Sequence, residues 1–307
     1  MIEDPLDSLA VVVVNYGSSS LLERNLVPIA RQTGARVVVV DNFTDDAERT
    51  RIVGLAAAEG WSTVLPGGNT GFGGGINLGV ARARAEGSTR YLLLNPDATI
   101  GLADVSTLLR HSEAAPLALL SPRVLRPDGS VWFDGADLYL HDGRIRSPRR
   151  RQSLAPERWE PWLSGACLMV TDLLWQTVGG FDETYFLYWE DVDLSHRVLA
   201  AGGTLELCAD ATAVHDEGGT QGRHGAAKSS SYYFYNIRNR MTFAVRNLAD
   251  DDVRRWRRLV LPVAREVLLQ GGRKQFVQSL GPWVAGVRGV LAARRVAREY
   301  TPGSRPR

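Results

Sequence analysis

The sequence predicts an α/β fold, in which helices flank a doubly wound mixed sheet and a helical appendage follows. Two continuous apolar runs, at residues 9–14 and 37–40, are rich in valine, which is typical of strands buried on both faces of a parallel sheet. Stretches with spaced apolar residues lie between such runs, as in strand–helix–strand units. Ligands bind at the carboxyl ends of the strands in sheets of this kind, so functional residues are expected there.

The N-terminal part of the chain supplies four strands and two crossover helices. Spaced apolar residues predict a helix over 20–34, and a second helix starts near Gly75. The expected strands are residues 9–14, 37–40, 62–65 and 90–94.

Beyond residue 120 the pattern changes. The Arg-Pro-Asp-Gly-Ser turn at 126–130 predicts a hairpin whose first strand covers 131–140. Residues 144–160 are basic and contain proline, which predicts a mobile loop over the site. The remaining expected elements are a strand at 162–170, a helix that ends at Gly179-Gly180, a strand at 211–215 and helices from Ser229 onward.

Composition excludes several classes of protein. The chain has 307 residues, 44% of them hydrophobic, which is enough for a sizeable core. It contains no run of ~18 or more apolar residues and no cleavable leader, so neither a transmembrane nor a secreted protein is predicted. Cys167 and Cys208 lie in apolar segments without metal-ligand spacing, which indicates buried thiols in a reducing cytosol. We therefore expect a cytoplasmic location.

Charge is distributed unevenly along the chain. Residues 1–220 carry 18 Lys and Arg against 29 Asp and Glu, a balance of −11, whereas residues 221–307 carry 18 against 5, a balance of +13. Over 253–298, arginine mixes with tryptophan, leucine and valine, which favours an anionic membrane surface as partner. A solvated basic helix pair is the alternative. No nucleic-acid-binding module is recognised here, so nucleic acid is not expected as a partner.

Residues 69–79 place five glycines at a strand-to-helix junction, where backbone N–H groups can approach a phosphate. A dinucleotide fingerprint needs G-x-G-x-x-G after the first strand, but Ile76 stands at the last position and the segment follows the third strand. A dehydrogenase is therefore excluded. A tight turn with close backbone packing is the structural alternative. Asp41 ends a valine strand, where it can accept from a nucleobase or ribose, or merely cap the next helix.

Asn95-Pro96-Asp97 follows an apolar strand, and His215 ends a late one. A carboxylate at such a position can meet a divalent cation and a diphosphate, because Mg²⁺ and Mn²⁺ prefer oxygen ligands and substrate phosphates. A histidine nitrogen suits Mn²⁺ better than Mg²⁺. An Asn-Pro turn and a structural histidine are the alternatives. Two protein ligands are sparse, so the diphosphate is expected to complete the shell.

Glu190, Asp191 and Asp193 place three carboxylates within four residues, directly after an aromatic run. Like charges this close raise each other's pKa, so the cluster indicates a function such as a general base. The alternative is a helix N-terminus whose acids complement the macrodipole.

Taken in order, these segments resemble the family 2 glycosyltransferases, which have the GT-A fold. The resemblance is greatest to bacterial rhamnosyltransferases that act on polyprenyl-diphosphate-linked sugars. It covers roughly residues 9–245, and the ordered set is specific although each segment alone is weak. The segments that carry it are 11–16, 41–42, 69–77, 95–97, 164–166, 179–182, 190–193, His215 and 232–240.

The resemblance implies a role for each matching position. Asp41 would pair with the pyrimidine base, Asp97 and His215 would bind Mn²⁺ or Mg²⁺, Asp191 would be the catalytic base, and Glu190 would orient the acceptor. The other nucleotide-sugar-binding residues implied are Asn15, Asn69, Gly71, Gly75 and Asn77, with Arg238 or Arg240 at the leaving diphosphate. The acceptor-binding residues would be Trp162, Ser164, Gly165 and Glu190. Two positions depart from the family pattern: Asn95 replaces the first acid of its DxD motif, as in the rhamnosyltransferase-like branch, and Phe43 replaces a small residue.

The function implied is inverting transfer of a sugar, with L-rhamnose from dTDP-rhamnose as the best match. The acceptor would be a saccharide, lipid-linked, in bacterial cell-wall or polysaccharide assembly. Residues 1–245 would form the catalytic domain, with a nucleotide-sugar half at 1–120 and an acceptor half at 121–245. Outside the resemblance, the charge and apolar pattern of residues 246–307 predict a basic amphipathic helical region on the inner face of the cell membrane. The alternatives are a UDP-hexose or UDP-galactofuranose transferase of the same fold and a non-catalytic nucleotide-sugar- or lipid-binding module, and a homodimer stays open.

Overall fold

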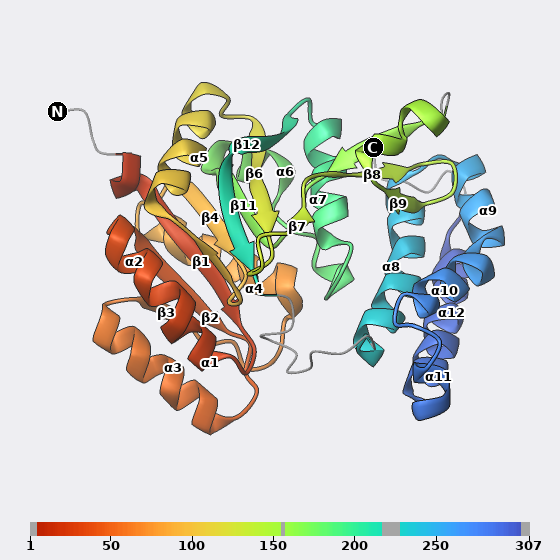
Figure 1. Ribbon diagram of the computed structural model, residues 1–307, viewed down its shortest axis with the longest axis horizontal. Helices are drawn as coiled ribbons and strands as arrows, with labels where there is room; N and C mark the ends of the chain where they lie inside the picture. The colour runs from red at the N-terminus through yellow and green to blue at the C-terminus, as the bar shows by residue number, and fades with distance from the viewer. Residues whose placement is uncertain (1–4, 155–156, 217–227, 302–307) are drawn as a thin grey trace. The chain divides into compact units, whose positions relative to one another are not determined.

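The structure is a computed structural model that describes residues 5–154, 157–216 and 228–301 (Figure 1). Contacts within the chain divide it into two compact units. The first, here called the sheet unit, comprises Met1–Gly135, Trp162–Phe186 and Leu194–Arg223. The second, the helical unit, comprises Ala136–Pro161, Leu187–Asp193 and His224–Arg307. Each unit is described by itself.

The sheet unit contains a nine-stranded mixed sheet in the order β3-β2-β1-β4-β11-β6-β12-β5, with β7 paired to β6. β1 pairs in parallel with both β2 and β4, whereas β11 runs antiparallel to β4 and β6. The predicted mixed α/β fold is therefore confirmed. The strands are β1 (Leu9–Asn15), β2 (Arg36–Asp41), β3 (Ser62–Val64), β4 (Arg90–Leu94), β5 (Ala98–Ile100), β6 (Ala118–Leu125), β7 (Val131–Phe133), β11 (Cys167–Thr171) and β12 (Thr204–His215).

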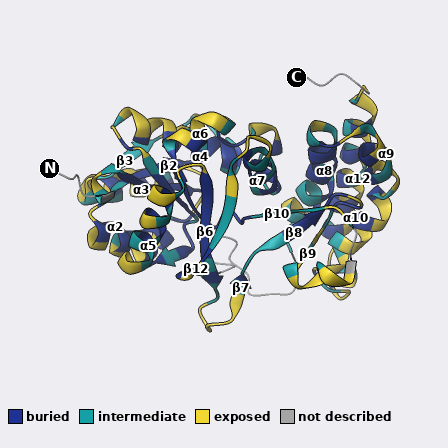
Figure 2. Cartoon of the chain, turned by 90° about the horizontal axis from the view of Figure 1, so that it is seen from above, coloured by how far each residue is buried: buried dark blue, intermediate teal, exposed yellow. Residues whose placement is uncertain are grey.

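The valine runs form β2 and β1, the second and third strands of this sheet. β1 and β2 are buried almost throughout, as their β-branched composition predicts (Figure 2). The helical segments are η1 (Pro5–Ser8), α1 (Ser19–Leu21), η2 (Leu22–Leu26), α2 (Val27–Thr33), α3 (Asp46–Glu59), α4 (Gly71–Ala85), α5 (Leu102–Ala114), α6 (Asp172–Val178) and η5 (Glu183–Tyr185). Helix α7 (Glu190–Ala200) starts among residues of the helical unit and ends among those of the sheet unit.

The helical unit packs its helices around large aromatic side chains. Trp256 is fully buried, its ring stacks on Phe243 at 5.9 Å, and its Nε1 donates to Leu140 O at 2.8 Å. α12 packs closely on α8, where a Cβ at Gly289 would lie 3.1 Å from Ile237 Cβ. The helices are α8 (Ser230–Asn247), α9 (Asp250–Arg258), α10 (Val260–Leu269), α11 (Gln275–Gln278) and α12 (Gly281–Glu299), with the short segments η3 (Pro148–Arg150) and η4 (Gln152–Leu154). A small sheet has the order β10-β8-β9, formed by β8 (Ala136–Tyr139), β9 (Arg144–Arg146) and β10 (Trp159–Trp162).

Two of the expected strands are divided in the structure. The turn at 126–130 does join two antiparallel strands, β6 and β7, but the strand expected over 131–140 is broken. Gly135, at a φ of 87°, separates β7 from β8, and the two strands belong to different sheets. The strand expected at 162–170 is divided in the same way into the end of β10 and β11.

The loop expected over 144–160 contains β9, the start of β10 and two 3₁₀ turns instead, although residues 155–156 lie outside the described chain. Buried carboxylates hold its arginines. Asp142 lies 2.8 Å from Arg144 and 2.5 Å from Arg146, and Asp137 lies 2.7 Å from Arg151. Basic composition was therefore misleading here, because these arginines neutralise acids that the sequence places in β8 and the turn after it.

Glycines let α4 approach β1 and β2 closely. A Cβ at Gly79 would lie 2.4 Å from Val12 Cγ1 and 3.0 Å from Val40 Cγ2, and a Cβ at Gly75 would lie 2.8 Å from Val14 Cγ2. Real Cβ atoms do not approach other atoms so closely, so any side chain here would push the helix off β1 and β2. The glycine-rich segment thus has a packing role beside any role at a ligand.

Gly79→Ala should lower the free energy of unfolding by about 1–3 kcal/mol, because the added methyl overpacks the valine contact. Gly54→Ala is the matched control, since Gly54 lies inside α3 with open space around its Cβ position. That change should raise stability by about 0.5–1 kcal/mol through helix propensity. Urea unfolding of both variants measures the difference, and equal effects would show that the α4 contact is not tight.

Candidate active site

Strand pairing brings Asp97 and His215 together. β5 and β12 run antiparallel with His215 opposite Ala98, the residue after Asp97. His215 Nε2 lies 3.0 Å from Asp97 Oδ1 and 3.5 Å from Asn95 Nδ2. Both side chains of the Asp97–His215 pair are buried, and His215 Nδ1 has no hydrogen-bond partner among the described residues. Residues 118 positions apart in the sequence therefore form one polar pair at the ends of two strands.

The chemistry of this pair fits a divalent cation. It offers a carboxylate oxygen and an imidazole nitrogen 3.0 Å apart. The side-chain amide of Asn95, in the same turn as Asp97, has an oxygen that could serve as a third ligand. Mixed oxygen and nitrogen donors suit Mn²⁺, whereas Mg²⁺ prefers oxygen alone. Two or three protein ligands leave most of an octahedral shell open to phosphate oxygens and water.

Aromatic side chains from the β7 region line the neighbourhood of His215. The Trp132 ring lies 4.4 Å from the His215 ring, and Phe133 lies 5.2 Å from Trp162. The indole Nε1 of Trp162 is buried and makes no hydrogen bond to a described residue. An indole N–H normally finds a partner when buried, so this donor is available to a ligand.

Ser164 and Gly165, in the break between β10 and β11, are both buried. Ser164 Oγ accepts from Ala166 N at 3.4 Å, and Ala166 O accepts from Asn95 N at 3.0 Å. The segment that was expected to contact an acceptor therefore lies directly beside the Asn-Pro-Asp turn. Trp132 was not among the expected site residues, because only the pairing of β7 with β6 shows where it lies.

At the carboxyl ends of the valine strands β1 and β2, on the same edge of the sheet as the turn after β4, Asn15 and Asp41 are fully buried. Asn15 Nδ2 lies 3.5 Å from Asp41 Oδ1 and 3.4 Å from Glu48 Oε1. Asp41 Oδ2 accepts from Arg49 Nε at 2.7 Å, and the Arg49 guanidinium lies over the Phe43 ring at 4.6 Å. Asp41 is thus already neutralised by a half-buried arginine, which sequence reasoning missed.

Asn42 holds the glycine-rich turn in place. Its Oδ1 accepts from Thr70 Oγ1 at 2.8 Å, and its Nδ2 donates to Gly71 O at 2.7 Å. Asn69 Oδ1 in turn accepts from Gly71 N at 2.8 Å. Gly71 has a φ of 80°, and a Cβ there would lie 2.2 Å from Phe186 O, so only glycine fits.

Asn77 joins α4 to the segment after α6. Its Nδ2 donates to Phe181 O at 2.9 Å and lies 3.0 Å from Glu183 Oε1, while its Oδ1 accepts from Phe181 N at 2.9 Å. These three hydrogen bonds use both the oxygen and the nitrogen of the Asn77 amide. They fix the Gly-Gly-Phe-Asp segment at 179–182, which precedes the carboxylate cluster in the sequence.

The carboxylate cluster begins α7 after an unusual turn. Tyr188 and Trp189 have φ values of 63° and 76°, a left-handed conformation that is rare and strained for bulky residues. Asn239, fully buried in α8, donates from Nδ2 to Leu187 O at 2.9 Å and to Tyr188 O at 2.8 Å. The Trp189 ring packs on Phe243 at 5.7 Å. These contacts hold the turn that precedes Glu190.

The three carboxylates have different environments. Burial raises the pKa of Glu190, and the charges of Asp191 and Asp193 raise it further. Glu190 Oε2 has no hydrogen-bond partner among the described residues. Asp193 is buried and accepts from Asn247 Nδ2 at 2.8 Å, so it is anchored to α8. Asp191 is only half-buried, and its carboxylate accepts from Val192 N at 2.8 Å in the first turn of the helix.

The two candidate arginines of α8 also differ. The Arg240 guanidinium donates to the backbone carbonyls of Asp142, Gly143 and Trp256 and lies over the Trp256 ring at 4.5 Å. Its burial lowers its pKa to about 9. Arg238 is half-buried, and its Nη1 donates to Asn239 Oδ1 at 2.8 Å. Arg240 therefore has structural contacts, whereas Arg238 is the more accessible of the two.

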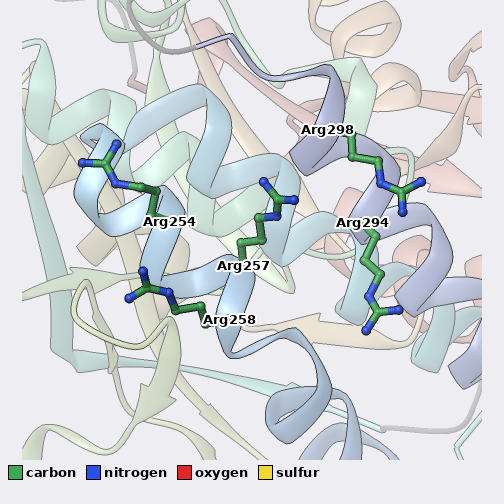
Figure 3. A pocket seen from close by; sticks show the side chains of 5 residues that line it. All are labelled: Arg254, Arg257, Arg258, Arg294 and Arg298. Atoms are coloured by element: carbon green, nitrogen blue, oxygen red, sulfur yellow. The ribbon is translucent and has the colours of Figure 1, made fainter.

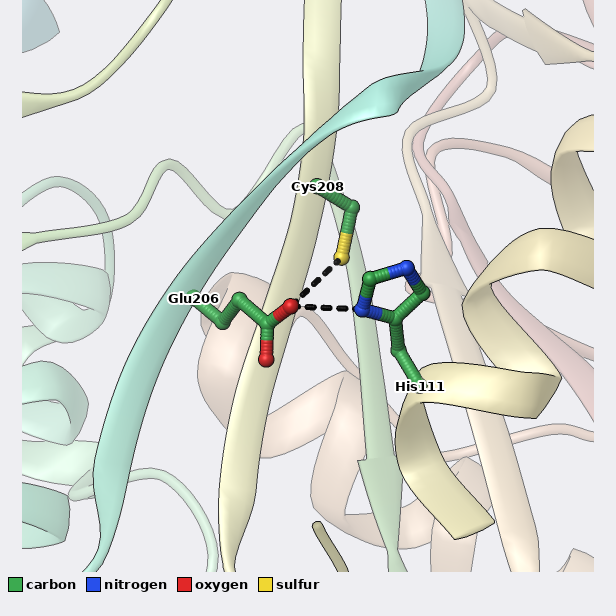
Figure 4. Close-up of side chains that lie close together, drawn as sticks. All are labelled: His111, Glu206 and Cys208. Atoms are coloured by element: carbon green, nitrogen blue, oxygen red, sulfur yellow. Dashed lines mark hydrogen bonds and ion pairs between the residues drawn. The ribbon is translucent and has the colours of Figure 1, made fainter. Parts of the chain in front are cut away.

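A second cluster of potential metal donors lies elsewhere in the sheet unit, formed by His111, Glu206 and Cys208 (Figure 4). His111 Nδ1 lies 2.5 Å from Glu206 Oε1, and Nε2 lies 3.3 Å from Asp210 Oδ2. Burial opposes the His111 charge, but hydrogen bonds to these two carboxylates raise the net pKa. Burial, followed by the charges of Glu206 and Asp210, raises the Cys208 pKa to about 12. A metal binds the neutral imidazole and the thiolate, so the raised pKa values of His111 and of the buried free thiol Cys208 oppose metal binding at this cluster.

The sheet has the GT-A fold of glycosyltransferases. The chain matches the solved structure of a mannosyltransferase from Pyrobaculum calidifontis, which was determined in complex with GDP-mannose and Mn²⁺. The match has a TM-score of 0.55, 14% sequence identity, and covers 96% of this chain and 89% of that protein. Likeness at this level of identity shows the fold.

The particular family follows from the sequence. No protein-family profile matches the chain. It is 32% identical over 262 residues to the N-acetylglucosaminyl-diphospho-decaprenol L-rhamnosyltransferase of Mycobacterium tuberculosis, covering 75% of this chain and 84% of that enzyme. It is 28% identical over 244 residues to the low-salt glycan biosynthesis hexosyltransferase Agl10 of Haloferax volcanii, covering 76% and 75%. The chain therefore belongs to the glycosyltransferase family that includes this bacterial rhamnosyltransferase.

Asn239→Ala should loosen the turn before α7, because two backbone carbonyls lose their buried donor. We expect a loss of about 1–3 kcal/mol in unfolding free energy and faster amide hydrogen exchange at residues 187–193. Asn236→Ala is the matched control: it lies on the same helix, and among the described residues its Nδ2 donates to Tyr232 O within α8. Unchanged exchange at 187–193 in the Asn239 variant would show that the turn is held by other contacts.

Proposed function

We propose that the chain is an inverting, family 2 glycosyltransferase. It transfers a sugar, with L-rhamnose from dTDP-rhamnose as the best match, to a lipid-linked saccharide acceptor in bacterial cell-wall or polysaccharide assembly. The observation that carries this proposal is the similarity over 84% of the mycobacterial rhamnosyltransferase, which acts on a decaprenyl-diphosphate-linked sugar according to its name. The Asp97–His215 pair supports the same conclusion.

On the donor side, Asp41 and Asn15 would bind the nucleoside and the Asn69–Gly75 turn would approach the diphosphate. Asp97 and His215 would hold a divalent cation, which would supply positive charge to the leaving diphosphate. Arg238 would add a guanidinium at the same group, because the contacts of Arg240 are already taken by backbone carbonyls. Gly75 and Asn77 would act by keeping α4 in position.

On the acceptor side, Asp191 would be the base. It would take the proton from an acceptor hydroxyl as the oxygen attacks the anomeric carbon and the nucleoside diphosphate leaves from the opposite face. One displacement inverts the anomeric configuration. General-base assistance of this kind accelerates a reaction by roughly 10²–10⁴.

Glu190 would assist in two ways. Burial raises the pKa of Glu190 and so favours its neutral form, which would remove one negative charge from beside Asp191 and leave that carboxylate easier to ionise. A protonated carboxyl can also donate a hydrogen bond, so Glu190 can orient the acceptor. Trp162, Ser164 and Gly165 would complete the acceptor site, with the Trp162 Nε1–H as a donor to a sugar oxygen.

A hexosyltransferase is the second candidate, favoured by the similarity to Agl10, and a UDP-galactofuranose transferase belongs to the same alternative. These candidates differ only in donor. Thermal unfolding with dTDP-rhamnose, UDP-galactose, UDP-galactofuranose and GDP-mannose, each with Mn²⁺ or Mg²⁺, discriminates them. The true donor at ~100 Kd should stabilise the protein by about 2.7 kcal/mol. A chain that binds a donor but transfers no sugar to any acceptor would be a non-catalytic binding module.

Asp191→Asn should keep donor binding and lower transfer by ~10² or more, because only proton removal is lost. Asp193→Asn is the control, since Asp193 is anchored to Asn247 and should affect stability more than chemistry. Initial rates and donor Kd are measured for both variants. A larger loss of rate in the Asp193 variant would reverse the two assignments.

Asp97→Ala and His215→Ala should each weaken metal-dependent donor binding, and the His215 change should affect Mn²⁺ more than Mg²⁺. His111→Ala is the matched control, because His111 is also paired with carboxylates but lies in the other cluster. Titration calorimetry of nucleotide with each cation gives the affinities. Full activity in excess chelator would exclude the cation from the reaction, and Asn95→Asp should tighten cation binding if that position faces it.

A further inference from the structure

The outward face of α12 is apolar along its first three turns. Trp283, Val284, Val287 and Leu291 recur at helical spacing, Leu280 precedes them on the same face, and each is more than half exposed. The opposite face of α12 is made of small residues, among them Gly286 and Gly289, packed on α10 and α8. The exposed stripe is therefore distinct from the surface that holds the helix in its unit.

The same outward face becomes cationic towards the end of the helix. Arg294 and Arg298 follow Leu291 at spacings of three and seven residues, so they continue the stripe. With three arginines of α9 they line a cleft of about 500 Å³ (Figure 3). The five lining residues are Arg254, Arg257, Arg258, Arg294 and Arg298.

These guanidinium groups are poorly neutralised. Arg254 pairs with Asp251, but in the described part of the chain no carboxylate forms an ion pair with Arg257, Arg258, Arg294 or Arg298. Like charges gathered in one cleft repel each other. An anion with several oxygens, such as a phosphate group, is the ligand that guanidinium groups bind best.

We infer that the outward face of α12 docks on a bilayer that contains anionic phospholipid, with headgroup phosphates in the arginine cleft. A 19-residue helix is about 28 Å long, so it can lie along the surface with its first turns in the acyl boundary and its last turns among the headgroups. Among the described residues, no helix combines the length and the hydropathy of a membrane span. The docking goes beyond the transfer reaction without depending on it.

Charge favours a membrane over a second copy of the chain as the occupant. Residues 221–307 carry 18 basic against 5 acidic residues, so two copies that met through this face would bring like charges together. An anionic bilayer has the complementary charge and also accepts the apolar stripe.

Vesicle flotation tests the inference with the full chain. The protein should float with phosphatidylglycerol/phosphatidylcholine vesicles, float poorly with phosphatidylcholine alone, and lose binding as salt rises. Arg294→Gln with Arg298→Gln should weaken partitioning by about 25-fold, from about fivefold per arginine near anionic lipid. Arg110→Gln with Arg149→Gln removes the same charge from exposed positions outside α9 and α12 and should have little effect.

The apolar stripe is tested separately. Trp283→Ser with Val287→Ser should lower partitioning at least tenfold, while Leu173→Ser, an equally exposed change on α6, should not. Unchanged circular dichroism confirms that the variants fold. Flotation that is unaffected by both α12 variants would overturn the inference.

Two other occupants give their own results. A dimer in light scattering that the Trp283/Val287 variant abolishes, with no flotation, would assign the face to a second copy. Binding of soluble inorganic diphosphate that needs Arg294 and Arg298, again without flotation, would assign the cleft to a free phosphate compound. Either result would overturn membrane docking, and neither depends on sugar transfer.

Discussion

The antiparallel pairing of β5 with β12 is the interaction on which the candidate cation site depends. β5 is only three residues long and follows β4 after the Asn-Pro-Asp turn, so its position fixes Asp97. β12 lies between β6 and β5: it pairs in parallel with β6, with a register shift between Cys208 and Thr212, and its last residues, Ala213–His215, pair with β5 on the other side. If the backbone hydrogen bonds between β5 and β12 were lost, Asp97 and His215, which are far apart in the sequence, would separate.

The glycine-rich segment at 69–79 shapes the part of the sheet unit around β1, β2 and Asn42. Its last glycines bring α4 against β1 and β2, while its first glycine turns beneath Asn42 and beside Phe186 O. One segment therefore allows α4 to pack closely on the sheet and also permits the tight turn at Gly71. This explains why a phosphate-binding function and a packing function cannot be separated by composition alone.

Much of the fold could be predicted from the sequence, because local patterns determine it. The valine runs, the helix that ends at Gly179 and the C-terminal helices depend on periodicity and end signals. The hairpin at 131–140 and the loop at 144–160 could not be predicted, since a glycine with positive φ and two buried aspartates decide them. In the site, Asp97 and His215 were identifiable as chemical types, whereas Trp132, Asn42, Arg49 and Asn239 act through tertiary contacts that leave no periodic signal.

The left-handed turn before α7 has a consequence for how acceptor preference can change during evolution. A glycine at 189 would adopt the same φ without strain, yet the Trp189 ring would be lost from its contacts with Phe243 and Trp256. Because those aromatic residues belong to α8 and α9, substitutions in their packing shift the backbone that carries Glu190 and Asp191. Under the proposed roles of Glu190 and Asp191, adaptation to a new acceptor is open to apolar core positions, and a laboratory selection confined to pocket-lining residues would miss this route.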